Sequence, residues 1–283
     1  MQTIGESVIH TFVDGNQEIQ RIRNTAIRSG AGHLVSSYME LARKIADLQF
    51  RNSEHVLLFR GQSGDHKNKA GNTSLKPTIL RGEAELNPSP GTLTERFDRL
   101  RDAERELLAA YPFSDKDRLA KQRITRWSIL QHYEIVATPL LDVTHSLRVA
   151  ASFASHHAHN EAFIFVLGVP YLSGAITASA DAGLQIARLA SMCPPDAMRP
   201  HIQEGYLLGE YPELGDYEQK SLYQHYEVDF GLRLVAKFRF NPAAFWLRSK
   251  GFPMLAPKTL SPPTRNDPFS VVAKRIKKAL ISR

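Results

Sequence analysis

The chain has 283 residues, of which 42% are hydrophobic and 23% charged, a balance that excludes a disordered or fibrous protein and allows one large or two small domains. Its single cysteine, Cys193, excludes an internal disulfide and a thiolate metal cage, which favours a reducing, cytoplasmic setting. The net charge of +7 indicates either a polyanionic partner such as nucleic acid or a protein that is merely basic.

Neither an export signal nor a membrane segment is expected. The first residues lack a basic stretch followed by an apolar one. The longest apolar run, residues 162–172, is shorter than the roughly 18–20 residues that span a bilayer. We therefore expect no membrane among the partners of this protein.

The first part of the chain changes from a helical to an extended pattern. Residues 33–50 repeat apolar side chains at helical spacing, which predicts an amphipathic helix. Residues 55–59 form a short apolar run, which predicts a buried strand that ends at Arg60. Residues 61–72 are polar and rich in glycine and lysine, so they predict a loop beside that strand end.

A helix is predicted to follow the breaker cluster at residues 87–91. Thr92 and Glu95 have the spacing of a capping box, which marks a helix start. The apolar residues after it repeat at helical spacing. The expected buried stripe consists of Phe97, Leu100, Ala103 or Glu104, Leu107 and Leu108.

The middle of the chain predicts two more helices and a central strand. Residues 115–132 predict a helix that is capped by Ser114, with Leu119, Trp127 and Leu130 facing inward. Residues 147–156 predict another helix. The continuously apolar residues 163–167 predict a strand that is buried on both faces.

The last third is expected to hold a helix, a strand and a basic helical tail. Residues 182–192 predict a helix that stops at Pro194-Pro195, and residues 232–240 predict a strand. In residues 271–283, apolar side chains four apart alternate with lysine and arginine, which predicts a basic amphipathic helix. We favour a helix that docks or lies in solvent over one that reads nucleic acid. Helices and strands do not alternate regularly, so the sequence favours the α+β class.

Three parts of the chain are distinguished by these patterns. Residues 1–50 are expected to form an N-terminal helical segment, residues 51–245 the main domain, and residues 246–283 a basic C-terminal extension.

Phe59-Arg60-Gly61-Gln62 stands at the end of a predicted strand. A guanidinium on a rigid strand offers a planar fork to a diphosphate, and glycine lets a ligand approach the backbone. The alternative is a structural arginine that pairs with a buried carboxylate. All four residues are candidates for binding a phosphate-bearing cofactor.

A second group of polar residues lies among apolar ones: His132, Tyr133, Thr138 and Asp142. Buried polar groups need hydrogen-bond partners, either one another or a ligand. We interpret His132, Tyr133 and Thr138 as lining a ligand site. For Asp142 we favour a structural role, either as the N-cap of the helix starting near residue 147 or as an acceptor that fixes the loop before it.

The third candidate pair is Gln203 and Glu204, which stand side by side before Gly205 and Tyr206. In a strand they would point to opposite faces, so only one of them could face a given pocket. The sequence leaves open which one does.

No metal site is expected. His156, His157 and His159 do not share one helical face, and no nearby carboxylate or cysteine supports them. The sequence also lacks a Gly-x-Gly-x-x-Gly, a Walker loop, a His-Glu-x-x-His and a Gly-x-Ser-x-Gly motif.

Several blocks in order resemble the FRG domain family, over residues 56–206. These blocks are Phe59–Gln62, Leu75–Arg81, Gln131–Tyr133, Leu140–Thr144 and Arg199–Gly205. The chain departs from the family where Gly-x-Pro-Thr-Arg is usual and residues 134–139 stand instead. No role of that arginine is therefore carried over.

The order of the blocks also resembles that of ADP-ribosyltransferases. This resemblance implies a split mixed or antiparallel sheet with flanking helices, NAD as co-substrate and no metal. It implies that Arg60 grips the NAD pyrophosphate while Thr138, His132 and Tyr133 hold the nicotinamide ribose. Gln203 or Glu204 would contact that ribose and stabilise the oxocarbenium-like charge that develops as nicotinamide leaves.

Three functional hypotheses follow. The first is an NAD-dependent ADP-ribosyltransferase, a toxin or phage-defence effector that modifies nucleic acid and is controlled by an antitoxin or regulatory protein. The second is a non-catalytic FRG module that binds nucleic acid or a partner protein. The third is a metal-free hydrolase or nuclease built on His132 and Glu204.

Overall fold

A mixed sheet of eight strands forms the centre of the described part of the computed structural model, which comprises residues 1–5, 8–82, 88–111, 116–193, 197–213, 215, 218, 228–263 and 267–281. Its strand order is β3-β10-β6-β4-β5-β9-β8-β7, and neighbours are antiparallel except for β3 and β10. The strands of this sheet are β3 His33–Leu34, β4 Val56–Gln62, β5 Leu141–Thr144, β6 Ala162–Val169, β7 Ile176–Ser179, β8 Leu184–Arg188, β9 Gly205–Glu210 and β10 Leu234–Phe240. A separate hairpin joins β1 (Ile9–Phe12) to β2 (Ile19–Ile22).

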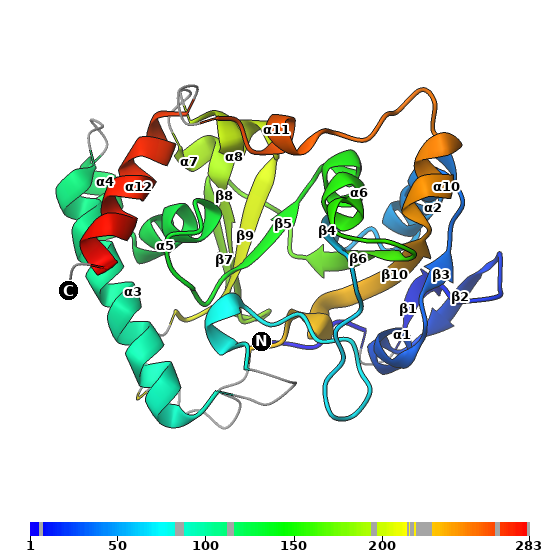
Figure 1. Cartoon of the computed structure of the whole chain (residues 1–283). Coiled ribbons are helices and arrows are strands. Elements are labelled where there is room, and N and C mark those ends of the chain that lie inside the picture. The colour runs from blue at the N-terminus through cyan, green and yellow to red at the C-terminus, as the bar shows by residue number, and fades with distance from the viewer. Residues whose placement is uncertain are drawn as a thin grey trace.

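Helices flank this sheet, so the expected α+β class with a large mixed sheet is confirmed. They are α1 Asn24–Ser29, α2 Tyr38–Arg51, α3 Pro90–Ala110, α4 Lys116–Lys121, α5 Arg123–His132, α6 Leu147–His156, α7 Leu189–Met192, α8 Met198–Ile202, α10 Pro242–Leu247, α11 Pro257–Leu260 and α12 Pro268–Ile281, with short 3₁₀ turns at Thr78–Leu80 and Phe230–Arg233. Figure 1 shows α3, α4, α5 and α12 grouped together, and α2, α6 and α10 on the opposite side of the picture.

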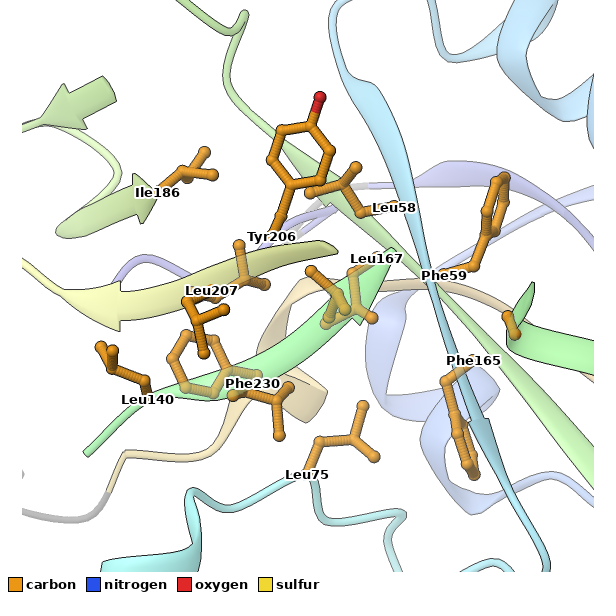
Figure 2. Close-up of a cluster of buried hydrophobic side chains, with 14 of the residues drawn as sticks. Leu58, Phe59, Leu75, Leu140, Phe165, Leu167, Ile186, Tyr206, Leu207 and Phe230 are labelled. Atoms are coloured by element: carbon orange, nitrogen blue, oxygen red, sulfur yellow. The ribbon is translucent and has the colours of Figure 1, made fainter. Parts of the chain in front are cut away.

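The core is organised around β6, whose eight residues are all buried. This confirms the predicted central strand, since β6 pairs with β10 on one side and with β4 on the other. Figure 2 shows part of the core, where Leu58 and Leu167 lie opposite each other on β4 and β6. Leu58 and Phe59 leave β4 on opposite sides, as adjacent residues of a strand must.

The sheet opens between β4 and β5. Whereas β4 pairs with β6 along its whole length, from Val56 to Gln62, it pairs with β5 only where Phe59 lies opposite Thr144. Because the two strands part on either side of this pair, their side chains border a space that the neighbouring helices enclose.

Two helix predictions are confirmed closely. The helix expected at residues 147–156 is α6, with the same bounds. In α3, the residues Phe97, Leu100, Ala103, Glu104 and Leu107 form the expected buried stripe. Periodicity located these helices because each packs one face on the core and leaves the other in solvent.

The described part of the C-terminal tail, which ends at Ile281, is helical as predicted. Phe269, Ala273 and Ile276 of α12 are buried, and the helix packs against α3. The tail therefore docks onto the body of the protein and contributes to its core.

Residues 182–192 do not form the predicted helix. They contain the strand β8 and the four-residue helix α7. Leu184 and Ile186 are buried because β8 lies between β7 and β9 and pairs with both. Pairing with a strand on each side determines the extended conformation of these residues, and the local sequence pattern, which is helical, does not predict this pairing.

Several helix ends also differ from the predictions. The helix expected from residue 33 begins at Tyr38, because Ser37 caps it by accepting a hydrogen bond from Glu40 N and because residues 33–34 pair with β10. The cap of α3 is Ser89, which accepts from Thr92 N, so the predicted capping box starts three residues late. The helix expected at residues 115–132 is divided into α4 and α5 by the extended backbone of Gln122.

Some predicted features lie outside the described residues. These are Asn87 of the first breaker cluster, the cap Ser114, residue 115, the breakers Pro194-Pro195 and the last two residues of the tail, 282–283.

One buried cluster runs through all three segments that the sequence distinguishes. Ile4 and Ile9 from the first, Phe59 from the second and Phe269 and Ile276 from the third belong to it. No described helix is both long and apolar enough to cross a membrane.

Candidate functional site

A cavity of about 370 Å³ lies where β4 parts from β5. Its wall is made by Phe59–Gln62 of β4, the end of α5, Asp142–Thr144 of β5, one side of α6, Arg199 of α8 with the capping residue Gln203, and the start of β9. The volume falls within the range of small-molecule sites, which is about 300–1,000 Å³. This cavity collects residues from four of the sequence blocks described above.

Arg60 reaches this cavity from the end of β4. Its Nη1 donates a hydrogen bond of 2.6 Å to the main-chain oxygen of Asp142 on β5. Burial lowers the pKa of Arg60 to about 10, while the negative charge of Asp142 opposes this shift, so the guanidinium is protonated at neutral pH. Arg60 thus bridges the opening of the sheet through a hydrogen bond to a backbone carbonyl. The hypothesis of a structural arginine predicted an ion pair with a buried carboxylate instead.

Gly61 is needed for packing. A Cβ added at Gly61 would lie 1.8 Å from the main-chain oxygen of Ala150 and 2.9 Å from the main-chain nitrogen of Ala154, both in α6. The backbone that approaches this glycine is therefore that of α6. Gly61 still borders the cavity, as do Phe59 and Gln62.

His132 lies at the C-terminal end of α5 and is 4% exposed. Burial, with the nearby positive charge of Arg199, lowers its pKa to about 3, so the imidazole is neutral at physiological pH. A neutral ring offers one donor and one acceptor nitrogen, and the tautomer decides which is which.

Four buried polar atoms on residues of this one cavity have no hydrogen-bond partner in the described part of the chain. They are Nε of Arg60, Oε1 of Gln62, Nε2 of His132 and Nε of Arg199. An unsatisfied buried polar group costs about 1–3 kcal/mol, so such groups seldom gather by chance. Their concentration around one cavity makes it the candidate site for a polar ligand.

One known family is similar to the part of the chain that supplies most of this cavity. Residues 55–162 match the FRG domain family. The FRG segment contributes β4, α5, β5 and α6, and thus most of the cavity wall, while Arg199, Gln203 and Gly205 lie beyond the match. Neither the curated proteins nor the solved structures contain a match to this chain.

Within the FRG segment, Thr138 lies behind the cavity wall. It is fully buried, and its Oγ1 donates to Oε1 of Gln131 at 2.9 Å. Nε2 of Gln131 in turn donates to Oδ2 of Asp142 at 2.7 Å. Gln131 and Asp142 line the cavity, so Thr138 reaches it only through them.

Tyr133 is directed away from the cavity. Its hydroxyl donates to the carboxylate of Asp267, with distances of 2.9 and 3.1 Å, and its ring stacks on Phe269 of α12. Burial, together with the charge of Asp267, raises the pKa of Tyr133. Asp267 also accepts from the backbone nitrogen of Arg199, so it ties the end of α5 to the start of α8.

Gln203 and Glu204 occupy a turn, which is a departure from the expected strand. Gln203 caps the C-terminus of α8 and lines the cavity, but its Nε2 donates to the main-chain oxygen of Leu260 at 2.6 Å. Glu204 has a φ of +45° and an exposed side chain, and β9 begins one residue later. The turn thus separates the two side chains, and Gln203 is the one at the cavity.

Of the two structural roles considered for Asp142, that of a helix cap is wrong. Asp142 belongs to β5, and Ser146 is the residue that precedes α6. Its carboxylate accepts a hydrogen bond from Gln131. The sequence of residues 142–147 could not predict this contact, because Gln131 lies on another element.

Sequence reasoning did not assign Arg199, Glu134 or Gln131 to the site. Arg199 and Glu134 form an ion pair of 2.5 Å at the cavity. The spacing of Arg199 and Gln203, four residues apart, was the available signal, since residues i and i+4 of a helix lie on one face. Among the described residues, no group of three or more His, Cys, Asp or Glu side chains could hold a metal ion.

Proposed function

We propose that the cavity between β4 and β5 binds NAD and that the protein is an NAD-dependent ADP-ribosyltransferase. The observation that carries this proposal is the set of four unpartnered polar atoms on Arg60, Gln62, His132 and Arg199 around one cavity. A ligand that satisfies them must offer both acceptors and donors.

NAD has this combination of groups. The two guanidiniums of Arg60 and Arg199 require acceptors, and pyrophosphate oxygens suit their planar forks. Oε1 of Gln62 requires a donor, which the amide of nicotinamide or the amino group of adenine can supply. The neutral ring of His132 already hydrogen-bonds to the backbone of Arg199, so its unpartnered Nε2 is an acceptor and also requires a donor.

The charges of the wall are balanced in a way that suits a zwitterionic ligand. Arg60 and Arg199 face the cavity together with the carboxylates of Asp142 and Glu134. Negative phosphates are attracted by the guanidiniums, whereas the positively charged nicotinamide ring is attracted by a carboxylate. NAD carries both kinds of charge.

The test is binding and turnover of NAD by the full chain. We expect saturable NAD binding in calorimetry and release of nicotinamide, with transfer of label to an acceptor. Arg60→Ala is expected to weaken NAD binding about 10- to 100-fold, the effect of losing hydrogen bonds from a charged group. Arg248→Ala, at an exposed position outside the cavity, is the matched control. If the wild-type protein neither binds NAD nor releases nicotinamide, the proposal is wrong.

A nucleic acid is the acceptor that we propose. The net charge of +7 supports it, since basic proteins attract phosphate backbones over long distances. Labelled NAD offered with RNA, DNA and a protein mixture tests the choice, and transfer to protein alone would contradict it.

A second candidate is a non-catalytic FRG module that binds nucleic acid or a partner protein. It is favoured by the turn at Gln203 and Glu204. The carboxamide of Gln203 already donates to the main-chain oxygen of Leu260, and the side chain of Glu204 is exposed outside the cavity, so neither is placed to act on a ligand there. Nucleic-acid binding that weakens with salt and survives Arg60→Ala, without any NAD binding, would support this candidate over the transferase.

A further inference from the structure

The carboxylate of Asp142 is held in one orientation at the cavity. Oδ2 accepts the hydrogen bond from Gln131 Nε2, and in the described residues no hydrogen bond reaches Oδ1. The main-chain oxygen of the same residue holds Arg60. Asp142 therefore places a carboxylate directly beside the guanidinium that is expected to bind phosphate.

The orientation of Gln131 is set by Thr138. Because Thr138 Oγ1 donates to Oε1 of Gln131, the NH₂ group of that side chain must face Asp142. Thr138 is itself fixed, since it is fully buried and its Oγ1 accepts from Leu140 N. A chain of two side-chain hydrogen bonds thus decides which oxygen of Asp142 is left for a ligand.

The other carboxylates near the cavity are less suited to this position. Glu134 is paired with Arg199, and Glu204 is exposed on the turn that precedes β9. Within the described residues no ion pair closes on Asp142, although its negative charge acts on the guanidiniums of Arg60 and Arg81. Because the hydrogen bond from Gln131 occupies Oδ2, Oδ1 is the oxygen left for a ligand.

We infer that Asp142, and not Glu204, is the catalytic carboxylate of this cavity, and that Gln131 and Thr138 are its positioning residues. This inference rests on the proposed function. In the reaction, the bond between C1′ of the ribose and the nicotinamide nitrogen breaks, and its electron pair leaves with nicotinamide. C1′ becomes oxocarbenium-like, and Asp142 stabilises this positive charge. An acceptor oxygen or nitrogen then bonds to C1′ and releases its proton to solvent, so that water as acceptor yields ADP-ribose, nicotinamide and one proton.

The geometry allows the charge to be removed without disturbing Arg60. Asp142→Asn retains the main-chain oxygen that holds Arg60 and a side-chain oxygen that can accept from Gln131. A preorganised charge beside a developing cation contributes about 10²- to 10³-fold to turnover. The variant should therefore lose catalysis and keep its ligand.

The experiment measures nicotinamide release and NAD affinity for the wild type, Asp142→Asn and Glu204→Gln. For Asp142→Asn we expect kcat to fall by about 10²- to 10³-fold, with the Kd for NAD changed less than about threefold. Full turnover by Asp142→Asn overturns the inference. So does loss of turnover in Glu204→Gln alone, which would make Glu204 the catalytic carboxylate.

The positioning role is tested at Thr138. Thr138→Val removes the hydroxyl at nearly constant volume and should lower kcat about tenfold, whereas Thr138→Ser, which keeps the hydroxyl, should restore it. Thr125→Val is the matched control, because Thr125 is also buried but hydrogen-bonds to Gln122, away from the cavity. Equal loss in the valine and serine variants would refute positioning through Gln131.

These outcomes separate the two proposals. A wild-type protein that releases no nicotinamide refutes the proposed transferase and, with it, the role of Asp142. A wild-type protein that turns over NAD while Asp142→Asn does so equally well refutes only the role of Asp142.

Discussion

Replacing Gly61 by alanine is expected to destabilise the protein strongly. The new Cβ would lie 1.8 Å from the main-chain oxygen of Ala150, 2.8 Å from its carbonyl carbon and 2.9 Å from the main-chain nitrogen of Ala154. To reach even 3.0 Å from that oxygen, α6 must retreat from β4 by 3.0 − 1.8, about 1.2 Å. No side chain can rotate to relieve the clash, because all three atoms belong to backbone.

The magnitude follows from this rigidity. Overpacking a core costs typically about 1–3 kcal/mol, and a clash with helix backbone belongs at the upper end, about 3 kcal/mol. For a chain of this size, 1 kcal/mol shifts Tm by about 2–4 °C, so the expected fall in Tm is about 6–12 °C. Thermal unfolding and urea titration of Gly61→Ala measure both quantities.

Gly64→Ala is the matched control for this substitution. Gly64 lies in the adjoining loop, and a Cβ there would meet no atom within 4 Å. We expect its stability to stay within about 0.5 kcal/mol of the wild type, as for most surface changes. If Gly61→Ala were as stable as Gly64→Ala, the close contact of β4 with α6, and with it the structural reason for this glycine, would be refuted.

Three further predictions concern buried polar groups. Lys237 is 1% exposed and pairs with Asp65 at 2.7 Å, so Lys237→Met should cost about 3–5 kcal/mol in urea unfolding by stranding that carboxylate, and adding Asp65→Asn should recover part of the loss. The pKa of His132 is about 3 in the folded state and 6.5 in the unfolded state, so the unfolded chain binds the extra proton first as the pH falls. The free energy of unfolding should therefore fall below pH 6.5, by about 1.4 kcal/mol per pH unit, and His132→Gln should lack this component of the pH profile. Tyr133→Phe removes a hydrogen bond to the buried Asp267 and should lower the free energy of unfolding by about 1.5–3 kcal/mol, and a change below about 0.5 kcal/mol would show that this contact is not stabilising.

The location of the site could be predicted from the sequence in part. Phe59-Arg60-Gly61-Gln62 was recognised as a strand end with a side chain suited to phosphate, and its four residues do border the cavity. His132 and Gln203 border it as well. Their roles as ligands of NAD stay predictions.

The direction in which each polar side chain points could not be predicted. Tyr133 is adjacent to His132, yet its partner is Asp267, which lies 134 positions later in the chain. Thr138 is engaged by Gln131, and Asp142 accepts from that same side chain. These partners lie on different elements, so only the packing of α5, β5 and α12 brings them into contact.

The sequence by itself determined those elements whose pattern reflects a single packed face. The α6 helix and the stripe of α3 follow from helical periodicity, and β6 follows from an apolar run that is buried on both sides. Tertiary structure decided that residues 184–188 extend, because pairing with strands on both sides outweighs a local helical preference. It also decided the cavity, which exists because β4 and β5 touch at one pair of residues and then part. Local patterns carry no record of such a parting, since the distance between two strands is set by everything that packs around them.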